Sequence, residues 1–136
     1  MATTAARRVH ASERGDIEGM LQRRVSGEVK FDPFSRVLYS TDASIYQMEP
    51  VGVVIPRNVD DVLAVIDIAN ETGVPVLPRA GGTSLAGQTV NHAIVTDFSK
   101  YLNQIIEVNE EEMWARVQPG IVLDDLNRQL IPYGLM

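Results

Sequence analysis

The sequence predicts an α+β fold in which a parallel β–α–β layer is followed by the start of an antiparallel sheet. An apolar run at residues 51–55 is followed by a helical pattern and then by a second apolar run at 74–77. This is the order of a β–α–β crossover. Two strand-like segments, 104–108 and 113–118, then flank the acidic turn 109–112, which is typical of an antiparallel hairpin.

The N-terminal part contains one clear helical pattern. Residues 1–11 resemble a frayed leader, and Ser12 can cap a helix that ends at Gly27. The apolar residues at helical spacing in this segment are Ile17, Met20, Leu21 and Val25.

The pattern from residue 28 to residue 50 is irregular. Asp32-Pro33 marks a turn, because proline restricts the residue before it. Ser40-Thr41-Asp42 can cap a single helical turn through residues 43–46, which stops before Pro50. We therefore expect little regular structure in this segment.

The β–α–β unit has clear start and stop signals. The β-branched run Val51–Ile55 predicts a strand covered on both faces. Asn58 is a good N-cap for the following helix, and Gly73 stands at the position of a C-terminal glycine. A right-handed crossover then places Val76-Leu77 parallel to Val53-Val54. The expected apolar face of the helix consists of Val59, Val62, Leu63, Ile66 and Ala69.

Residues 78–90, which we call the glycine loop, follow the second parallel strand. Glycines at positions 81, 82 and 87 fall within seven residues. Missing side chains let a ligand approach the main chain, and successive amides that point the same way form a nest for an anion. The loop leaves the carboxyl end of a parallel strand, where ligands bind in open α/β sheets. We predict a pyrophosphate cradle; the alternative is a strand connection whose glycines serve turn geometry alone.

Two known phosphate motifs are excluded for this loop. It lacks the G-x-x-x-x-G-K-[ST] lysine pattern of a Walker P-loop. The residues after Gly87 lead into the strand-like run 93–96, whereas a G-x-G-x-x-G fingerprint opens directly into a helix. Loop amides, rather than a helix N-terminus, are therefore expected to hold the anion. The side chains that add donors are Arg79, Thr83, Ser84 and Gln88.

Composition excludes several other classes of site. A net charge of −6 over 136 residues argues against a nucleic-acid partner. The chain has no cysteine and two histidines, so we expect no metal site, neither zinc nor iron–sulfur. No apolar run reaches the roughly 18 residues that a membrane span needs. Residues 1–8 lack the apolar core of a secretory signal, which leaves the cytoplasm as the default location.

The C-terminal segment begins a second layer. After Pro119-Gly120, a helix is expected whose apolar residues are Leu123, Leu126 and Leu130. An antiparallel sheet has only begun when the chain reaches Met136, so open edges and an apolar face remain. We expect the chain to be a piece of a longer protein, and the fragment to self-associate through these edges.

Four blocks in order carry a family resemblance. They are Val53–Pro56 with the helix after it, Val76–Gly87, Ile94–Ser99 and Val117–Leu126. Over residues 50–136 this order resembles the PCMH-type FAD-binding domain of the vanillyl-alcohol oxidase and p-cresol methylhydroxylase superfamily. Residues 27–33 and 38–50 are similar to the leader of glycolate oxidase- and D-lactate dehydrogenase-type enzymes, more narrowly to the long versions fused to a C-terminal iron–sulfur domain.

The resemblance implies an FAD-dependent oxidoreductase as the full-length protein. Such an enzyme oxidises a D-2-hydroxy acid (D-lactate, glycolate or 2-hydroxyglutarate type) to the 2-oxo acid, with hydride passing to the flavin N5. An iron–sulfur cluster that takes the electrons onward would belong to the part after Met136. The implied division is a helical leader at 1–49, a β–α–β subdomain for the FAD pyrophosphate at 50–103, and the truncated start of a second FAD subdomain at 104–136.

Position by position, the implied FAD-binding residues form two groups. The first group is Arg79, Ala80, Gly81, Gly82, Thr83, Ser84, Gly87 and Gln88, and the second is Pro119, Gly120 and Ile121. Thr83 stands where some relatives carry a histidine bonded covalently to the flavin, so non-covalent FAD is implied. The catalytic and substrate-binding positions belong to segments that follow Met136. The alternatives are a non-catalytic β–α–β interaction module and an apo fragment without activity of its own.

Overall fold

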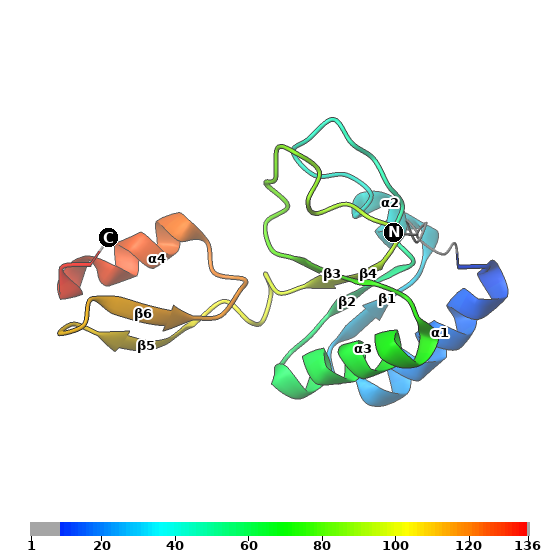
Figure 1. Ribbon diagram of the computed structural model, residues 1–136, viewed down its shortest axis with the longest axis horizontal. Coiled ribbons are helices and arrows are strands. Elements are labelled where there is room, and N and C mark those ends of the chain that lie inside the picture. The colour runs from blue at the N-terminus through cyan, green and yellow to red at the C-terminus, as the bar shows by residue number, and fades with distance from the viewer. Residues whose placement is uncertain (1–8, 136) are drawn as a thin grey trace, which may run out of the picture.

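A four-stranded sheet organises the larger of two lobes in the computed structural model, which describes residues 9–135 (Figure 1). In spatial order its strands are β1 (Glu28–Lys30), β2 (Gly52–Ile55), β4 (Ile94–Asp97) and β3 (Val76–Arg79). β2 and β3 run parallel to β4, and β1 is antiparallel to β2. Because the smaller lobe contains an antiparallel hairpin, the predicted α+β fold is confirmed.

The two strands of the predicted crossover are parallel, but they are not neighbours. Val53 of β2 and Leu77 of β3 both pair with Val95 of β4. β4 therefore lies between them. All four residues of β2 and of β4 are buried, as expected for central strands of a sheet covered on both faces.

Helix α3 (Val59–Thr72) has the predicted ends but buries a different face. Its cap is Asn58, and Gly73 ends it with a φ of 70°. Its buried residues are Asp61, Val65, Ile68 and Ala69. Of the predicted face, Ala69 is buried as predicted, whereas Val59, Leu63 and Ile66 are exposed. The helix is apolar on two sides, and packing against α1 and the sheet, which spacing does not encode, decides which side is buried.

Helix α1 (Ala11–Arg24) lies beside α3, and together they cover one face of the sheet (Figure 1). Ile17 and Leu21 are buried, as predicted. The helix begins directly after His10, whose amide donates to Glu13 Oε2 at 3.1 Å, rather than after Ser12. Residues 1–8 of the expected leader lie outside the described residues, and Val9 packs in the core.

The segment from residue 28 to residue 50 is more regular than predicted. It supplies strand β1, and Asp32-Pro33 begins helix α2 (Pro33–Leu38) instead of a turn. The Asp32 carboxylate accepts a hydrogen bond from the Ser35 amide at 2.9 Å, and proline suits the first helical position. The α2–β2 loop (residues 39–51) has a bridge between Thr41 and Gln47 where a helical turn was expected.

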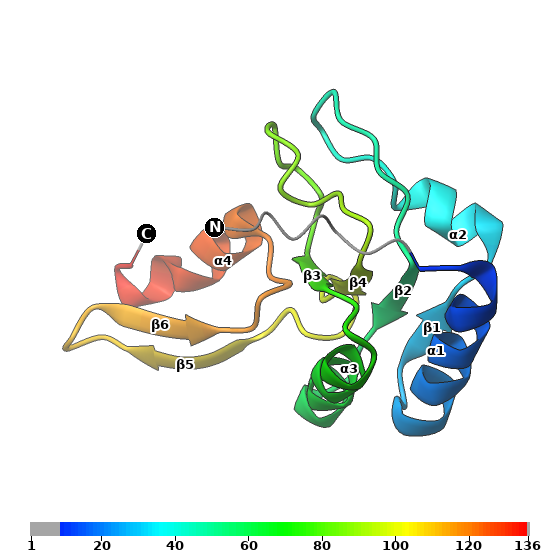
Figure 2. The ribbon, with the colours of Figure 1, turned by 45° about the vertical axis from the view of Figure 1, so that its right-hand side comes forward.

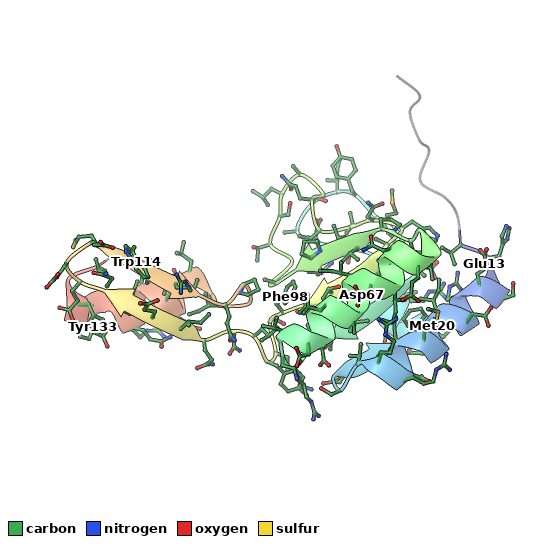
Figure 3. All side chains as sticks on the ribbon, turned by 60° about the horizontal axis from the view of Figure 1, so that its bottom comes forward. Glu13, Met20, Asp67, Phe98, Trp114 and Tyr133 are labelled. Atoms are coloured by element: carbon green, nitrogen blue, oxygen red, sulfur yellow. The ribbon has the colours of Figure 1, made fainter. Side chains whose placement is uncertain are left out.

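The smaller lobe consists of the predicted hairpin and helix. Its elements are β5 (Ile105–Asn109), β6 (Trp114–Val117), α4 (Leu123–Leu130) and the short 3₁₀ helix η1 (Ile131–Tyr133). Leu130 of α4 is buried, whereas Leu123 is 66% exposed. Phe98 lies at the waist where the chain passes from the sheet into this lobe (Figure 3). Within residues 9–135, no helix is long and apolar enough to cross a membrane.

Candidate functional site

The glycine loop projects from the end of β3 beside the α2–β2 loop (Figure 2). Gly81, Thr83 and Gln88 are exposed rather than folded against the core. Gly82 and Gly87 have φ values of 66° and 78°, in the left-handed region that glycine enters without steric cost. The loop therefore presents its main chain at the surface.

The first part of this loop offers unused main-chain donors. Across residues 9–135, the amides of residues 81–84 donate no hydrogen bond to another protein group. A Cβ at Gly81 would approach only Thr83 Cγ2, at 3.6 Å, so the space in front of this residue is open. Accessible amides next to missing side chains suit an anion such as a diphosphate.

A cavity of about 610 Å³ opens beside these amides, between the two lobes. This volume falls within the roughly 300–1,000 Å³ typical of small-molecule sites. It brings the first predicted group, through Ala80, Gly81 and Thr83, next to Gly120 and Ile121 of the second. Pro119 does not line it. The residues that sequence reasoning missed are Ser99, Asn103, Gln104, Val122, Leu123, Asp124, Asp125, Arg128 and Gln129.

Gly120 lines this cavity at the point where the two lobes join. A Cβ at this position would lie 2.1 Å from the Phe98 carbonyl oxygen and 2.8 Å from that of Leu102. The Gly120 amide also donates to the Leu102 carbonyl at 2.8 Å. Only glycine permits this approach of two backbones, so Gly120 fixes the small lobe against the turn after β4.

Three of the remaining predicted loop residues, Gly82, Ser84 and Gln88, line a second, more open hollow of about 610 Å³. The Ser84 hydroxyl contacts Gln88 Oε1 and accepts from the Gln88 amide at 3.2 Å. These two side chains therefore shape the loop itself. Gly87 instead packs under Tyr46, whose Cδ2 would lie 2.6 Å from a Cβ there.

The Arg79 guanidinium, which we expected to face a phosphate, donates to three backbone carbonyls. Its acceptors are Thr41 at 2.9 Å, Thr89 at 3.1 Å and Tyr39 at 3.4 Å. It also lies 5.2 Å from the centre of the Tyr39 ring, within cation–π range. In this structure Arg79 therefore joins the α2–β2 loop to the glycine loop.

Tyr39 connects this arginine to the end of β4. Its hydroxyl donates to Asp97 Oδ2 at 2.6 Å, and the Ser99 amide donates to Asp97 Oδ1 at 2.8 Å. Burial, followed by the bond to Asp97, raises the pKa of Tyr39, so the phenol keeps its proton.

Across residues 9–135, no cluster of three or more histidines and carboxylates is placed to hold a metal ion.

The chain is similar in sequence to a known protein family and to several characterised proteins. A family described as FAD binding domain matches residues 50–136. D-2-hydroxyglutarate dehydrogenase of Pseudomonas putida is 40% identical over 122 residues, which cover 88% of this chain and 12% of that protein. Glycolate oxidase subunit GlcD of Bacillus subtilis is 40% identical over 117 residues, 82% of this chain and 25% of that subunit. The chain thus spans a small fraction of these relatives.

Solved structures share the fold at lower sequence identity. p-Cresol methylhydroxylase superposes with a TM-score of 0.72 and 18% identity, over 93% of this chain and 26% of that one. 4-Ethylphenol oxidase of Gulosibacter chungangensis gives a TM-score of 0.75 and 21% identity, over 96% and 27%. The fold expected from the sequence resemblance is the fold of these proteins.

Proposed function

This chain belongs to the family of FAD binding domains, and from that premise we propose that it is the N-terminal part of the FAD-binding module of a flavin-dependent oxidoreductase. The proposed reaction of the full-length protein converts a D-2-hydroxy acid into the 2-oxo acid. Relatives named for D-2-hydroxyglutarate, glycolate and D-lactate support this substrate class. The chain covers 12% of the first of these, so the substrate-binding and catalytic groups are assigned to other segments.

The open amides of the glycine loop are the observation that carries the FAD assignment. The amides of residues 81–84 have no protein partner among residues 9–135 and adjoin a cavity that also reaches Gly120 and Ile121. We propose that these amides bind the FAD diphosphate, with the other residues of the two predicted groups shaping the site. Bound FAD supplies the electron-accepting chemistry. Thr83 offers a hydroxyl rather than an imidazole, in keeping with non-covalent FAD.

We also propose how the chain is divided into subdomains. We assign residues 50–103 to the pyrophosphate-binding subdomain and residues 104–136 to the start of a second subdomain, preceded by the leader at 1–49. Among the described residues 9–135, β3 pairs only with β4, and β5 only with β6. Each lobe therefore has strand edges through which the isolated fragment would self-associate. We also propose a cytoplasmic location and no nucleic-acid partner, the latter supported by the net charge of −6.

Substitution of Gly81 by valine tests the site in the full-length protein. Beyond the adjacent residues, a Cβ at this position would approach only Thr83 Cγ2, at 3.6 Å. The fold should therefore persist while the valine side chain occupies the place of the diphosphate. We expect Gly81→Val to purify without flavin and the parent protein to release FAD on denaturation. Gly15→Val, at an open position in α1, is the matched control.

Two results would contradict the proposal. A Gly81→Val protein that retains as much flavin as its parent would remove the glycine loop from the FAD site. A parent protein that releases no flavin and does not quench the fluorescence of added FAD would favour the interaction-module alternative.

A further inference from the structure

The α2–β2 loop is bonded to the glycine loop at three separated points. At the start of the glycine loop, Arg79 donates to the carbonyls of Tyr39 and Thr41. In the middle, the Ala43 amide donates to the Gly82 carbonyl at 3.1 Å. At the end, the Thr89 hydroxyl donates to Asp42 Oδ2 at 2.9 Å. The unpartnered amides of residues 81–84 lie within the stretch that these bonds enclose.

Asp42 is the centre of this connection. Its Oδ1 accepts from the Ser44 amide at 2.9 Å, which shapes the α2–β2 loop, while Oδ2 accepts from the hydroxyl and, at 3.4 Å, the amide of Thr89. The adjoining residue, Ala43, makes the bond to Gly82. One carboxylate therefore sets the conformation of its own loop and anchors the returning end of the other.

A carboxylate next to an anion-binding loop is electrostatically unfavourable for the anion. The Asp42 hydrogen bonds must therefore bring a compensating benefit if the loop binds a diphosphate. Fixing the amides before the ligand arrives is such a benefit, because a preorganised site loses less conformational entropy on binding.

We propose that Asp42 is a positioning residue, which holds the amides of residues 81–84 in their anion-binding arrangement through Thr89 and the Ala43–Gly82 bond. This inference rests on the proposed FAD function. The bonds from Ser44 and then Thr89 keep the pKa of Asp42 at about 2, so the carboxylate form that accepts all of them persists at neutral pH.

The variant Asp42→Asn distinguishes a positioning role of Asp42 from mere electrostatic repulsion between its carboxylate and the diphosphate. The asparagine side chain has one acceptor oxygen instead of two, so it cannot accept from both the Ser44 amide and Thr89. The substitution also removes the negative charge. If Asp42 only repels the diphosphate, the variant binds FAD more tightly, most visibly at low salt. If Asp42 positions the loop, the variant binds FAD more weakly at low and at high salt.

Two measurements on the full-length apo protein carry the test. Hydrogen exchange of peptides that cover residues 42–48 and 86–90 reports the connection without any flavin, because the amides of Ala43, Ser44 and Thr89 donate its hydrogen bonds. Fluorescence-quenching titration gives the dissociation constant for FAD. For Asp42→Asn we expect roughly tenfold faster exchange and roughly tenfold weaker FAD binding. Thr89→Val should act in the same direction, and Thr89→Ser should restore the parent values. Glu111→Gln, the same charge change in the exposed hairpin turn, should change neither quantity.

The two measurements also separate the inference from the function on which it rests. Unchanged exchange in Asp42→Asn and Thr89→Val, or tighter FAD binding by Asp42→Asn, would overturn the positioning role while leaving the FAD site intact. Faster exchange in a protein whose parent form binds no FAD would overturn the proposed function and leave the connection between the loops standing.

Discussion

The side chain of Arg79 occupies the space that a Cβ on Gly82 would need. That Cβ would lie 2.5 Å from Arg79 Nη2, and Gly82 also has a φ of 66°. Gly81, its neighbour, has neither restriction. The paired glycines of the loop therefore differ in purpose: Gly82 accommodates the arginine and the turn, whereas Gly81 leaves room at the surface.

This difference predicts that alanine at Gly82 mainly lowers stability, whereas alanine at Gly81 mainly weakens FAD binding. Gly82→Ala should lower the free energy of unfolding by about 1–2 kcal/mol from the left-handed backbone alone, with a further loss from displacing Arg79. Gly81→Ala should stay within about 0.5 kcal/mol of the parent while weakening FAD binding. Urea denaturation and FAD titration measure the two effects. Equal stabilities of the two variants would refute this assignment.

Gly120→Ala should be more damaging than either. The atoms that its methyl group would meet are the backbone oxygens of Phe98 and Leu102, which cannot rotate away as a side chain can. We expect a loss of about 3 kcal/mol, at the upper end of overpacking costs. Gly15→Ala, in open space on α1, should instead add up to about 1 kcal/mol. The two unfolding midpoints should therefore shift in opposite directions.

Asp61 joins the start of α3 to the turn before β1, and its loss should be costly. This carboxylate is 3% exposed and accepts from the Ser26 amide at 2.8 Å and the Arg57 amide at 2.9 Å. Burial acts to raise its pKa, yet these amides hold the pKa below its usual value. Asp61→Ala leaves both amides without an acceptor, so we expect a loss of about 2–3 kcal/mol.

The neighbouring residue supplies the control for this prediction. Asp60 is exposed in the same first turn of α3, so Asp60→Ala should change the free energy of unfolding by no more than about 0.5 kcal/mol. Thermal unfolding of both variants gives the comparison. Similar losses would show that helix-end charge, rather than the buried bonds of Asp61, is responsible.

Glu28 should make stability depend on pH in the acid range. Lys100, then Lys30 and the Tyr101 hydroxyl, lower its pKa from 4.5 to about 2. Because the folded-state pKa is depressed, the stabilisation is complete above pH 4.5 and is lost as the pH falls towards 2. The carboxylate is partly solvated, so we expect a contribution of about 1 kcal/mol.

Urea denaturation of the parent and of Glu28→Gln between pH 2 and 7 measures this contribution. The parent should be the more stable at pH 7, and the difference should shrink below pH 4.5. If the difference in stability between the parent and Glu28→Gln stays constant from pH 2 to 7, the charge of Glu28 does not contribute to stability.

Local signals in the sequence predicted much of the fold. Asn58 and Gly73 delimit α3 because capping and left-handed glycine are decided by the nearest residues. β1 was missed because three residues, Glu28–Lys30, are too few for a periodic pattern. The buried side of α3 and the position of β4 depend on partners far along the chain, which periodicity does not register.

The candidate site, too, could be predicted only in part from the sequence. The open amides at Gly81 and Thr83 follow from local glycine content, and the loop lies where the sequence predicted. The bonds of Arg79 to Thr41 and Tyr39 join residues about forty positions apart. The sequence shows a positive charge beside a glycine-rich loop, but only the folded chain shows which acceptors that charge meets.

The place of β4 in the sheet has a consequence for how the polypeptide folds during synthesis. β2, α3 and β3 leave the ribosome before residues 94–97, yet β2 and β3 share no ladder and meet only through those residues. A nascent chain that ends before position 94 holds two strands with no partner between them. The parallel strands can therefore pair only after the glycine loop and β4 have been synthesised. The glycine loop has then left the ribosomal tunnel before the sheet that supports it forms.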